Sequence, residues 1–182
     1  MKHIVLTAAL LAAFASPVLA QKTKMVGGAE MYPTKNIIEN AVNSKDHTTL
    51  VAAVKAADLV ETLSSEGPFT VIAPTNAAFD ALPAGNVEGL LKPEAKAQLQ
   101  GVLTYHVLAG TFDSKAVAEA IKKGGGKASM KTVAGGELML SMKGSDLIAM
   151  DASGNSAKVT IADVYQSNRV IHVIDAVLLP KM

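Results

Sequence analysis

The chain has 182 residues, with 17 Lys+Arg against 16 Asp+Glu, and its net charge of +1 is too small for the basic field that nucleic-acid binding requires. It contains no cysteine, which excludes disulfides and thiolate metal sites. Hydrophobic residues make up 49% of the chain and aromatic residues only 4%, so we expect one globular domain with a core of aliphatic side chains and methionine.

The first twenty residues have the pattern of a signal peptide. Lys2 precedes an uncharged stretch from Ile4 to Phe14, and Ser16-Pro17 interrupt it before the small-residue site that ends at Ala20. The stretch spans only about half of a bilayer at about 1.5 Å per residue, and no second hydrophobic span follows. We therefore predict cleavage after Ala20 and a secreted or periplasmic mature chain without a transmembrane segment.

Residues 21–34 have no hydrophobic periodicity and contain a glycine pair, which predicts a flexible N-terminal arm; the folded domain is expected over residues 35–180. Short apolar stripes with helical spacing follow at Ile37–Ala41, Leu50–Ala57 and Leu59–Leu63. Asp46 is the predicted N-cap of the second of these helices.

A β-rich run, Phe69–Ala73, predicts a buried strand that Pro74 closes. Thr75 is placed to cap a short helix that starts at Asn76. A longer helix is predicted from Pro93, with Leu99, Val102, Leu103 and His106 on one stripe, and another from Lys115 to Lys122, which ends at the triple glycine 124–126.

The C-terminal third predicts strands. They cover Glu137–Lys143, Asp146–Asp151, Ala157–Val164 and Arg169–Leu179, and Gly144-Ser145 fits a two-residue type II′ hairpin turn. Helices first and an antiparallel meander last predict an α+β fold rather than a βαβ alternation.

The last predicted strand is apolar on both faces, which places it in the middle of the fold. Ile171, Val173 and Val177 point one way, and Val170, Ile174 and Leu178 point the other. His172 and Asp175 lie three residues apart, so an extended chain places them on opposite faces, and they cannot form a His–Asp catalytic pair without a bulge.

Three segments together resemble the fasciclin domain family. Residues 69–79 (FTVIAPTNAAF) resemble its first conserved box, Tyr105-His106 its central Tyr-His motif, and residues 170–180 (VIHVIDAVLLP) its second box. They occur in the right order from about Thr34 to Pro180. One box alone would be a weak signal, whereas three in order are specific.

The resemblance implies a wedge of two β-sheets with flanking helices, exported or on the cell surface, and adhesion to cells or matrix rather than catalysis. In animal members, integrin recognition is attributed to the Tyr-His region and to an Asp-Ile pair before the second box. These map onto Tyr105, His106 and Asp163-Val164, where valine replaces the isoleucine. The expected partner is a cell-surface or matrix protein or a polysaccharide, and weak self-association stays open.

A structural role for the polar residues of the boxes competes with a binding role. Buried polar groups are normally hydrogen-bonded, and a strand-to-helix turn needs a cap. We therefore predict one polar cluster in which His106 or His172 bonds the turn at Thr75 and Asn76.

An enzyme is not expected. Among the hydroxyl groups near the boxes, Thr75, Ser114 and Ser167, none lies in a Gly-x-Ser-x-Gly elbow. The histidines lack metal-ligand spacing, so no metal or cofactor is predicted. The methionines at 130, 139, 142 and 150 fit Cu(I), although core packing is their commoner role.

Two further interpretations stay open. The lysines at 122, 123, 127 and 131 form a basic patch around the triple glycine, which is either a solvated loop or a contact for acidic polysaccharide or lipid headgroups. The alternative to adhesion is a pocket between the wedge and the helices that binds a small lipid or glycan fragment.

Overall fold

The computed structural model describes residues 22–64, 67–83, 85–167 and 169–180, so the predicted signal peptide lies outside the described residues. The strands are β1 (Lys24–Val26), β2 (Ala29–Met31), β3 (Phe69–Pro74), β4 (Val107–Ala109), β5 (Lys127–Lys131), β6 (Glu137–Lys143), β7 (Asp146–Met150), β8 (Ser156–Gln166) and β9 (Arg169–Ile174). The helices are α1 (Ile37–Ala41), α2 (Thr48–Ala56), α3 (Val60–Ser64), α4 (Asn76–Asp80), α5 (Asn86–Leu90), the 3-10 turn η1 (Pro93–Ala95), α6 (Lys96–Tyr105) and α7 (Ser114–Lys123).

Two sheet halves meet along β8 and form the predicted wedge. The strand order is β4-β3-β9-β8-β7-β6-β5. The start of β8 pairs with β7, whereas its remainder pairs with β9, and the register shifts between Val159 and Val164. Strands β6 to β9 pair antiparallel in chain order, as predicted, and β5, which was not among the predicted strands, pairs antiparallel with β6. Strands β3 and β9 pair in parallel, which local periodicity does not reveal. The α+β fold class is confirmed.

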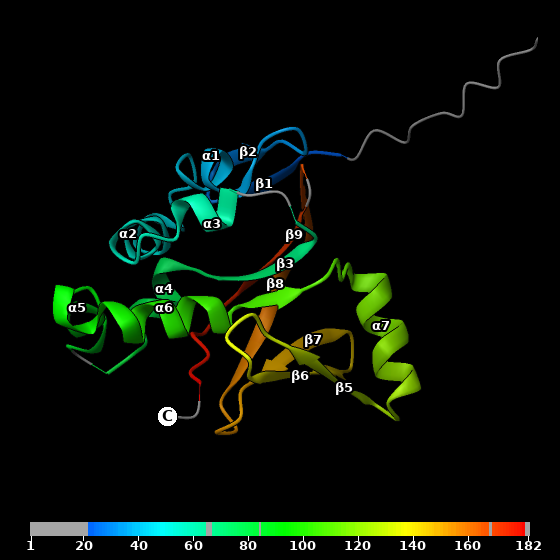
Figure 1. Cartoon of the computed structure of the whole chain (residues 1–182). Helices are drawn as coiled ribbons and strands as arrows, with labels where there is room; N and C mark the ends of the chain where they lie inside the picture. The colour runs from blue at the N-terminus through cyan, green and yellow to red at the C-terminus, as the bar shows by residue number, and fades with distance from the viewer. Residues whose placement is uncertain (1–21, 65–66, 84, 168, 181–182) are drawn as a thin grey trace, which may run out of the picture.

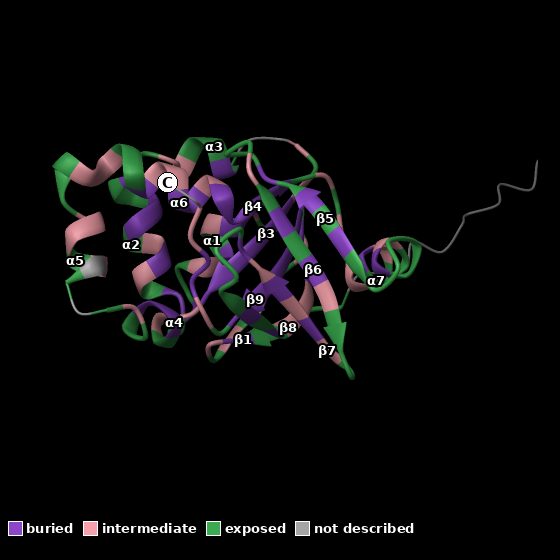
Figure 2. Ribbon diagram, turned by 90° about the horizontal axis from the view of Figure 1, so that it is seen from below, coloured by how far each residue is buried: buried purple, intermediate pink, exposed green. Residues whose placement is uncertain are grey.

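Strand β9 separates two apolar cores, as its two-faced pattern predicts. Ile171 and Val173 pack in one core with Val71 of β3, and Ile174 packs in the other with Ile72. All six residues of β9 are buried, and Figure 2 shows the strand in the interior. Together β3 and β9 therefore form the centre of the domain.

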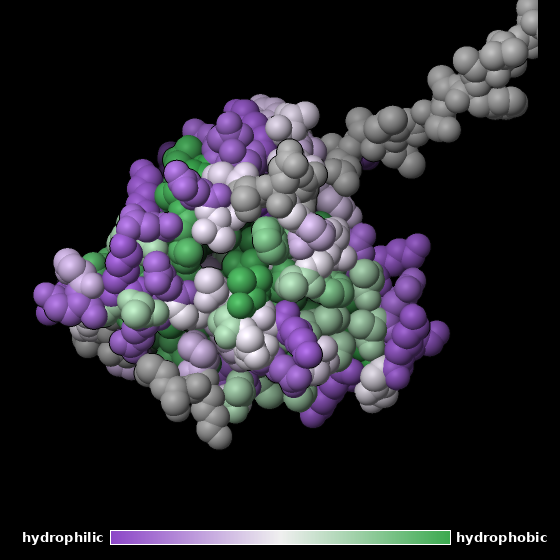
Figure 3. Space-filling view, viewed as in Figure 1, coloured by the Kyte–Doolittle hydropathy of each residue, from purple (hydrophilic) through white to green (hydrophobic). Residues whose placement is uncertain are grey.

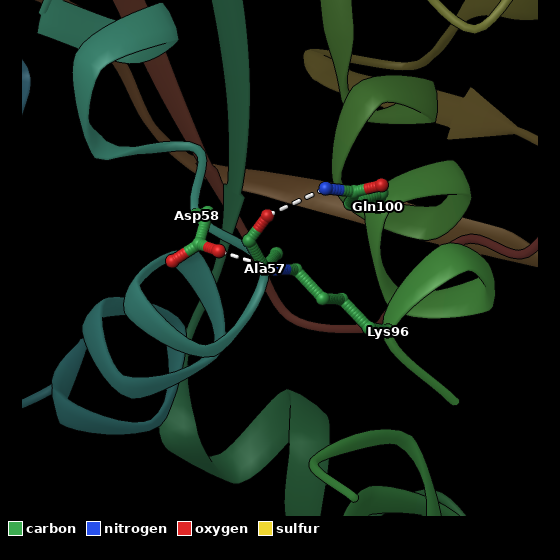
Figure 4. A network of polar contacts seen from close by, with 4 residues as sticks. All are labelled: Ala57, Asp58, Lys96 and Gln100. Carbon is green, nitrogen blue, oxygen red and sulfur yellow. Dashed lines mark hydrogen bonds and ion pairs between the residues drawn. The ribbon is translucent and has the colours of Figure 1, made fainter. Parts of the chain in front are cut away.

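The helices are distributed unequally around the sheet. Helices α1, α2, α3, α5 and α6 gather at the left of Figure 1, and α7 lies at the right beside β5. Where the chain turns after α2, the Ala57 carbonyl accepts from Gln100 Nε2 at 2.7 Å, and Asp58 forms an ion pair with Lys96 (Figure 4). Both ion-pair partners are exposed, so the carbonyl contact is the steadier link between α2 and α6.

The flexible arm predicted for residues 21–34 is wrong over the part that the structure describes. β1 and β2 form a hairpin there, with Val26 and Met31 each only 4% exposed. Both side chains pack in the first core, and Lys24 Nζ donates to the Ala162 carbonyl at 2.5 Å. The glycine pair forms the hairpin turn, where Gly27 and Gly28 both have positive φ. The domain therefore includes this hairpin.

No helix in the described ranges is both long enough and apolar enough to cross a bilayer.

We predict that truncating the hairpin's buried methionine destabilises the whole domain. Met31→Ala should lower the free energy of unfolding by about 2–3 kcal/mol, because it leaves a cavity in the core. Met25→Ala is the matched control, since Met25 is 61% exposed, and should change it by less than about 0.5 kcal/mol. Urea titration of both variants measures this, and equal effects would mean that the hairpin is not part of the core.

Candidate functional site

Tyr105, which ends α6, is buried. Its side chain is 1% exposed. The hydroxyl donates to the Glu137 carbonyl at 2.7 Å and accepts from the Ala152 amide at 3.3 Å. The ring lies against Gly136, where a Cβ would come within 2.9 Å of it. Tyr105 thus joins α6 to β6 and to the loop after β7, and burial raises the pKa of its hydroxyl.

His106 follows at once and is also interior. Its Nδ1 lies 2.8 Å from the Val102 carbonyl, and its Nε2 lies 3.1 Å from the Leu178 amide. A carbonyl only accepts and an amide only donates, so the ring is neutral with its proton on Nδ1. Burial lowers the pKa of His106, in keeping with this. The ring fastens the end of α6 to the segment that follows β9.

Asp163 lies at the irregularity in β8 and has a left-handed backbone, with φ of 54°. Its carboxylate accepts from the Ser114 amide at 2.6 Å and from the Ser114 hydroxyl at 2.5 Å. These bonds add to the N-cap that Asp113 makes for α7 through the Ala116 amide. The neighbouring Val164 is 2% exposed and packs in the first core.

His172 is central in β9 and 1% exposed. Its Nε2 lies 2.7 Å from the Phe112 carbonyl, and its Nδ1 accepts from the Asp163 amide at 3.4 Å. This ring is therefore neutral with its proton on Nε2. Burial lowers the pKa of His172 as well. It joins β9 to the irregular part of β8 and to the approach to α7.

Thr75 and Asn76 shape the corner between β3 and α4. The Thr75 hydroxyl accepts from the Ala78 amide at 3.3 Å, which is the predicted N-cap. Asn76 acts on a different helix: its Oδ1 accepts from the Thr49 amide at 3.0 Å, and its Nδ2 donates to the Lys45 carbonyl and to the Thr48 hydroxyl. The predicted capping of α2 by Asp46 is wrong, because Asn76 supplies that cap from a distant segment.

The single polar cluster predicted from Thr75, Asn76, His106 and His172 is wrong in its connections. Neither histidine bonds the turn after Pro74. The structure instead has three separate groups of side-chain hydrogen bonds to backbone: that of Asn76 at the start of α2, that of His106 at the end of α6 and that of His172 beside the start of α7. The physical reason is that each ring already has backbone partners for both of its nitrogens, near the end of α6 for His106 and beside the start of α7 for His172.

The four predicted contact residues do not form an exposed patch. Tyr105, His106 and Val164 are buried, and Asp163 is half-buried with both carboxylate oxygens bonded to Ser114. They lie in two places, at the end of α6 and beside the start of α7. Their role as contact residues stays a prediction, and in this conformation their side chains support the surface from within.

Ser114, His172 and Asp163 are the residue types of a hydrolase active site, but their hydrogen bonds do not join them as in such a site. In a Ser-His-Asp arrangement a histidine nitrogen accepts the serine proton, and a carboxylate orients that histidine. Here the Ser114 hydroxyl donates to a carboxylate, and both nitrogens of His172 are occupied by backbone groups. Asp175 accepts from the Lys158 amide and does not contact His172. In the described part of the chain, no group of three His, Asp or Glu side chains could hold a metal ion.

Two buried polar residues near the N-terminus escaped the sequence analysis. Asn40 on α1 exchanges hydrogen bonds with the backbone of Tyr32 at 3.0 and 2.9 Å. The Nδ1 of His47 lies 2.9 Å from the Ser44 hydroxyl, and burial lowers the pKa of His47. Asn40 shares the helical face of Ile37, which was an available signal, whereas nothing in the local pattern marks His47 as buried.

The cavities differ in size and access. One between the hairpin, α1 and β9 measures about 30 Å³, enough for one water-sized molecule. An open groove of about 400 Å³ runs between α5, α6 and the C-terminal segment. Its apolar lining includes Leu82, Leu90, Val102 and Leu179. A second open groove, of about 390 Å³, lies beside Thr111, Tyr165 and Arg169. Both grooves have the size of a small-molecule site, whereas the cavity of about 30 Å³ does not.

A family model described as "Fasciclin domain" matches residues 45–180. The chain belongs to the fasciclin domain family, and the resemblance carried by the three sequence boxes is confirmed. The hairpin β1–β2 and α1 precede the matched range.

Particular relatives agree with this assignment. "Protein sll1483" of Synechocystis sp. is 48% identical over 162 residues, which cover 89% of this chain and 83% of that protein. "Cell surface glycolipoprotein MPB83" of Mycobacterium bovis is 34% identical over 145 residues, which cover 77% of this chain and 58% of that protein.

A solved structure shares the fold. A FAS1 domain pair from the insect cell adhesion molecule fasciclin I matches with a TM-score of 0.71 at 14% sequence identity. The match covers 80% of this chain and 51% of that one. At this identity the similarity shows the fold alone.

We predict that Asn76 stabilises the domain by capping α2 from outside that helix. Asn76→Ala should lower the free energy of unfolding by about 1–2 kcal/mol, since the Thr49 amide loses its acceptor. Asn76→Asp should recover part of the loss, because a carboxylate still accepts at the positive end of α2 but cannot donate to the Lys45 carbonyl. Chemical denaturation compares the three proteins, and an unchanged stability in Asn76→Ala would contradict the capping role.

We also predict a stability that falls with acidity because of the interior histidines. The folded state holds His106 and His172 neutral, with each pKa lowered by burial, whereas unfolded histidines protonate near pH 6.5. The unfolded chain then binds more protons as the pH falls below about 6.5, so the free energy of unfolding decreases, by at most about 1.4 kcal/mol per pH unit for each histidine.

Urea unfolding at pH 7, 6 and 5 measures this dependence. His106→Gln and His172→Gln each remove one titrating group and should give a shallower dependence than the unsubstituted chain. If all three proteins showed the same slope, these rings would not be held neutral by the fold.

Proposed function

We propose that the chain is an exported, noncatalytic interaction module that attaches to a cell surface or extracellular matrix. The observation that carries this proposal is the internal use of the conserved-box residues. Tyr105, His106 and His172 are bonded to backbone groups within the domain. These side chains of the boxes thus hold the wedge together, so the proposed binding is a function of the outer surface of the domain.

The names of two similar proteins support the location and the role. MPB83 is called a cell surface glycolipoprotein, and fasciclin I is called a cell adhesion molecule. The proposed partner is a cell-surface or matrix protein or a polysaccharide. Apolar side chains gather near the centre of the face in Figure 3, with hydrophilic ones at its sides, a mixture that suits moderate, reversible contact.

A second candidate function is the binding of a small lipid or glycan fragment. The open groove beside α5 and α6 favours it, since its volume of about 400 Å³ and its leucine and valine lining match common ligand sites. The small internal cavity does not have room for such a ligand.

We expect the mature chain to be retained by cell-envelope or extracellular-matrix fractions in a pull-down. Retention should be weak for single molecules and stronger for a multivalent display on beads, because several weak contacts act together. Bovine serum albumin on the same beads is the control for nonspecific capture.

Other results would change the proposal. Absence of retention on every fraction contradicts attachment, and turnover of an ester, peptide or glycoside contradicts a noncatalytic role. A lipid or glycan fragment that copurifies with the native protein, detected by mass spectrometry, would favour the second candidate.

A further inference from the structure

Positive charge is concentrated in one segment of this nearly neutral chain. Residues 114–145 hold six lysines and two glutamates, a net charge of +4; three of the lysines are on α7, and the other three, Lys127, Lys131 and Lys143, are on the strands. The segment forms α7, β5 and β6. Helix α7 packs Val117 and Ile121 against the inner side of these strands, together with Leu138 and Leu140. The opposite, outer side of the strands is therefore the one turned to solvent.

Strand pairing places the outward residues of this sheet in rows. One row runs Ser129, Met139, Met150 and Ser156, and the next runs Lys127, Ser141, Ile148 and Lys158. Figure 2 shows β5, β6 and β7 at the front, with exposed and buried residues alternating along β6. We call the surface formed by these two rows, together with the flanking pairs Lys131 with Glu137 and Lys143 with Asp146, the outer sheet face.

The centre of the outer sheet face is apolar. Its margins carry Lys127, Lys131, Lys143 and Lys158 together with two carboxylates, Glu137 and Asp146, so lysines outnumber carboxylates on it by two. Met139 is 37% exposed, and Ile148 and Met150 are half-buried. Lys127 and Lys131 lie on the edge strand β5, four residues apart and thus about 13 Å along the strand. Lys143 lies at the far end of β6.

Three of these lysines are available to an outside anion. Within the part of the chain that the structure describes, the ion pairs are Lys96 with Asp58 and Lys158 with Asp146. Glu137, which faces Lys131 across the strands, accepts from the Ser129 hydroxyl. Lys127, Lys131 and Lys143 are exposed and have no carboxylate within ion-pair distance among the described residues.

We propose that the outer sheet face binds an acidic polysaccharide, a chain of sugars that carries carboxylate or sulfate groups. The lysines would contact the anionic groups, the serine hydroxyls would bond sugar hydroxyls, and Met139 with Met150 would contact the apolar faces of the sugar rings. This inference rests on the proposed attachment function and names both the surface and the partner.

The geometry favours a polysaccharide over an anionic membrane. The apolar residues Met139, Ile148 and Met150 lie on β6 and β7, between lysines on β5 and on β8. The turns at 124–126, 144–145 and 153–155 consist of Gly, Ser and Asn. Val133, in the turn between β5 and β6, and Met142, near the end of β6, are each 44% exposed, and two separate apolar side chains are a small area for insertion into a bilayer. A polymer with repeated charges also compensates for the weakness of each exposed ion pair by engaging several of them at once.

The test measures binding of the mature chain to immobilised polygalacturonate, dextran sulfate and uncharged dextran by biolayer interferometry. We expect binding to one or both acidic polymers, weakened by added salt because exposed ion pairs are screened. Binding to polygalacturonate identifies carboxylate as the recognised group, and binding to dextran sulfate alone identifies sulfate. Uncharged dextran should not bind.

Matched triple variants locate the surface. Lys127→Gln, Lys131→Gln and Lys143→Gln together should weaken binding about tenfold or more, since three ionic contacts are lost. The control removes the same charge elsewhere, through Lys45→Gln, Lys55→Gln and Lys92→Gln on the helical side, and should stay within about twofold of the unsubstituted chain. All six lysines are exposed, and circular dichroism checks that both variants fold.

Several results would overturn the inference: no binding to either acidic polymer, equal losses in the two triple variants, or binding to phosphatidylglycerol vesicles but not to polysaccharide. If envelope fractions retain the first triple variant as well as the unsubstituted chain, attachment stands and this surface assignment fails. If no fraction retains the unsubstituted chain, the attachment function itself fails.

Discussion

The parallel pairing of β3 with β9 is the constraint on which the rest of the structure depends. Both strands are almost wholly buried, with one apolar core on each side. A polar group on or beside such strands needs a partner inside the protein, because water does not reach it. His172 meets this demand within β9, and His106 meets it at the end of the helix that leads to β4, the other neighbour of β3.

The wedge follows from the same constraint. β8 must pair with buried β9 along one part and with solvent-facing β7 along another, and its irregularity near Asp163 separates the two pairings. The left-handed backbone at Asp163 costs free energy, which its bonds to Ser114 offset by holding the start of α7. The Asp-Val motif thus marks the point where one sheet half turns into the other.

Local sequence patterns were sufficient to predict those features that depend only on residues close together in the chain. The two-faced pattern of β9, the N-cap at Thr75 and the Gly144-Ser145 turn are of this kind, and the structure confirms them; Gly144 alone of that pair has positive φ. The β1–β2 hairpin, the β3–β9 pairing and the capping of α2 by Asn76 depend on segments distant in sequence. Short strands such as β1 have too few residues to show a period.

The same distinction separates the interior of the domain from its surface. The sequence boxes identified the family because they contain the central strands and the polar side chains that hydrogen-bond beside them. Packing in the core allows few other residues at these positions. Charge on the outer sheet face is under no such packing constraint, since exposed lysines can vary with little effect on stability. A gathering of lysines over β5 and β6 in a chain of balanced charge is therefore not explained by folding, and it is the feature of this structure that a function at the surface would account for.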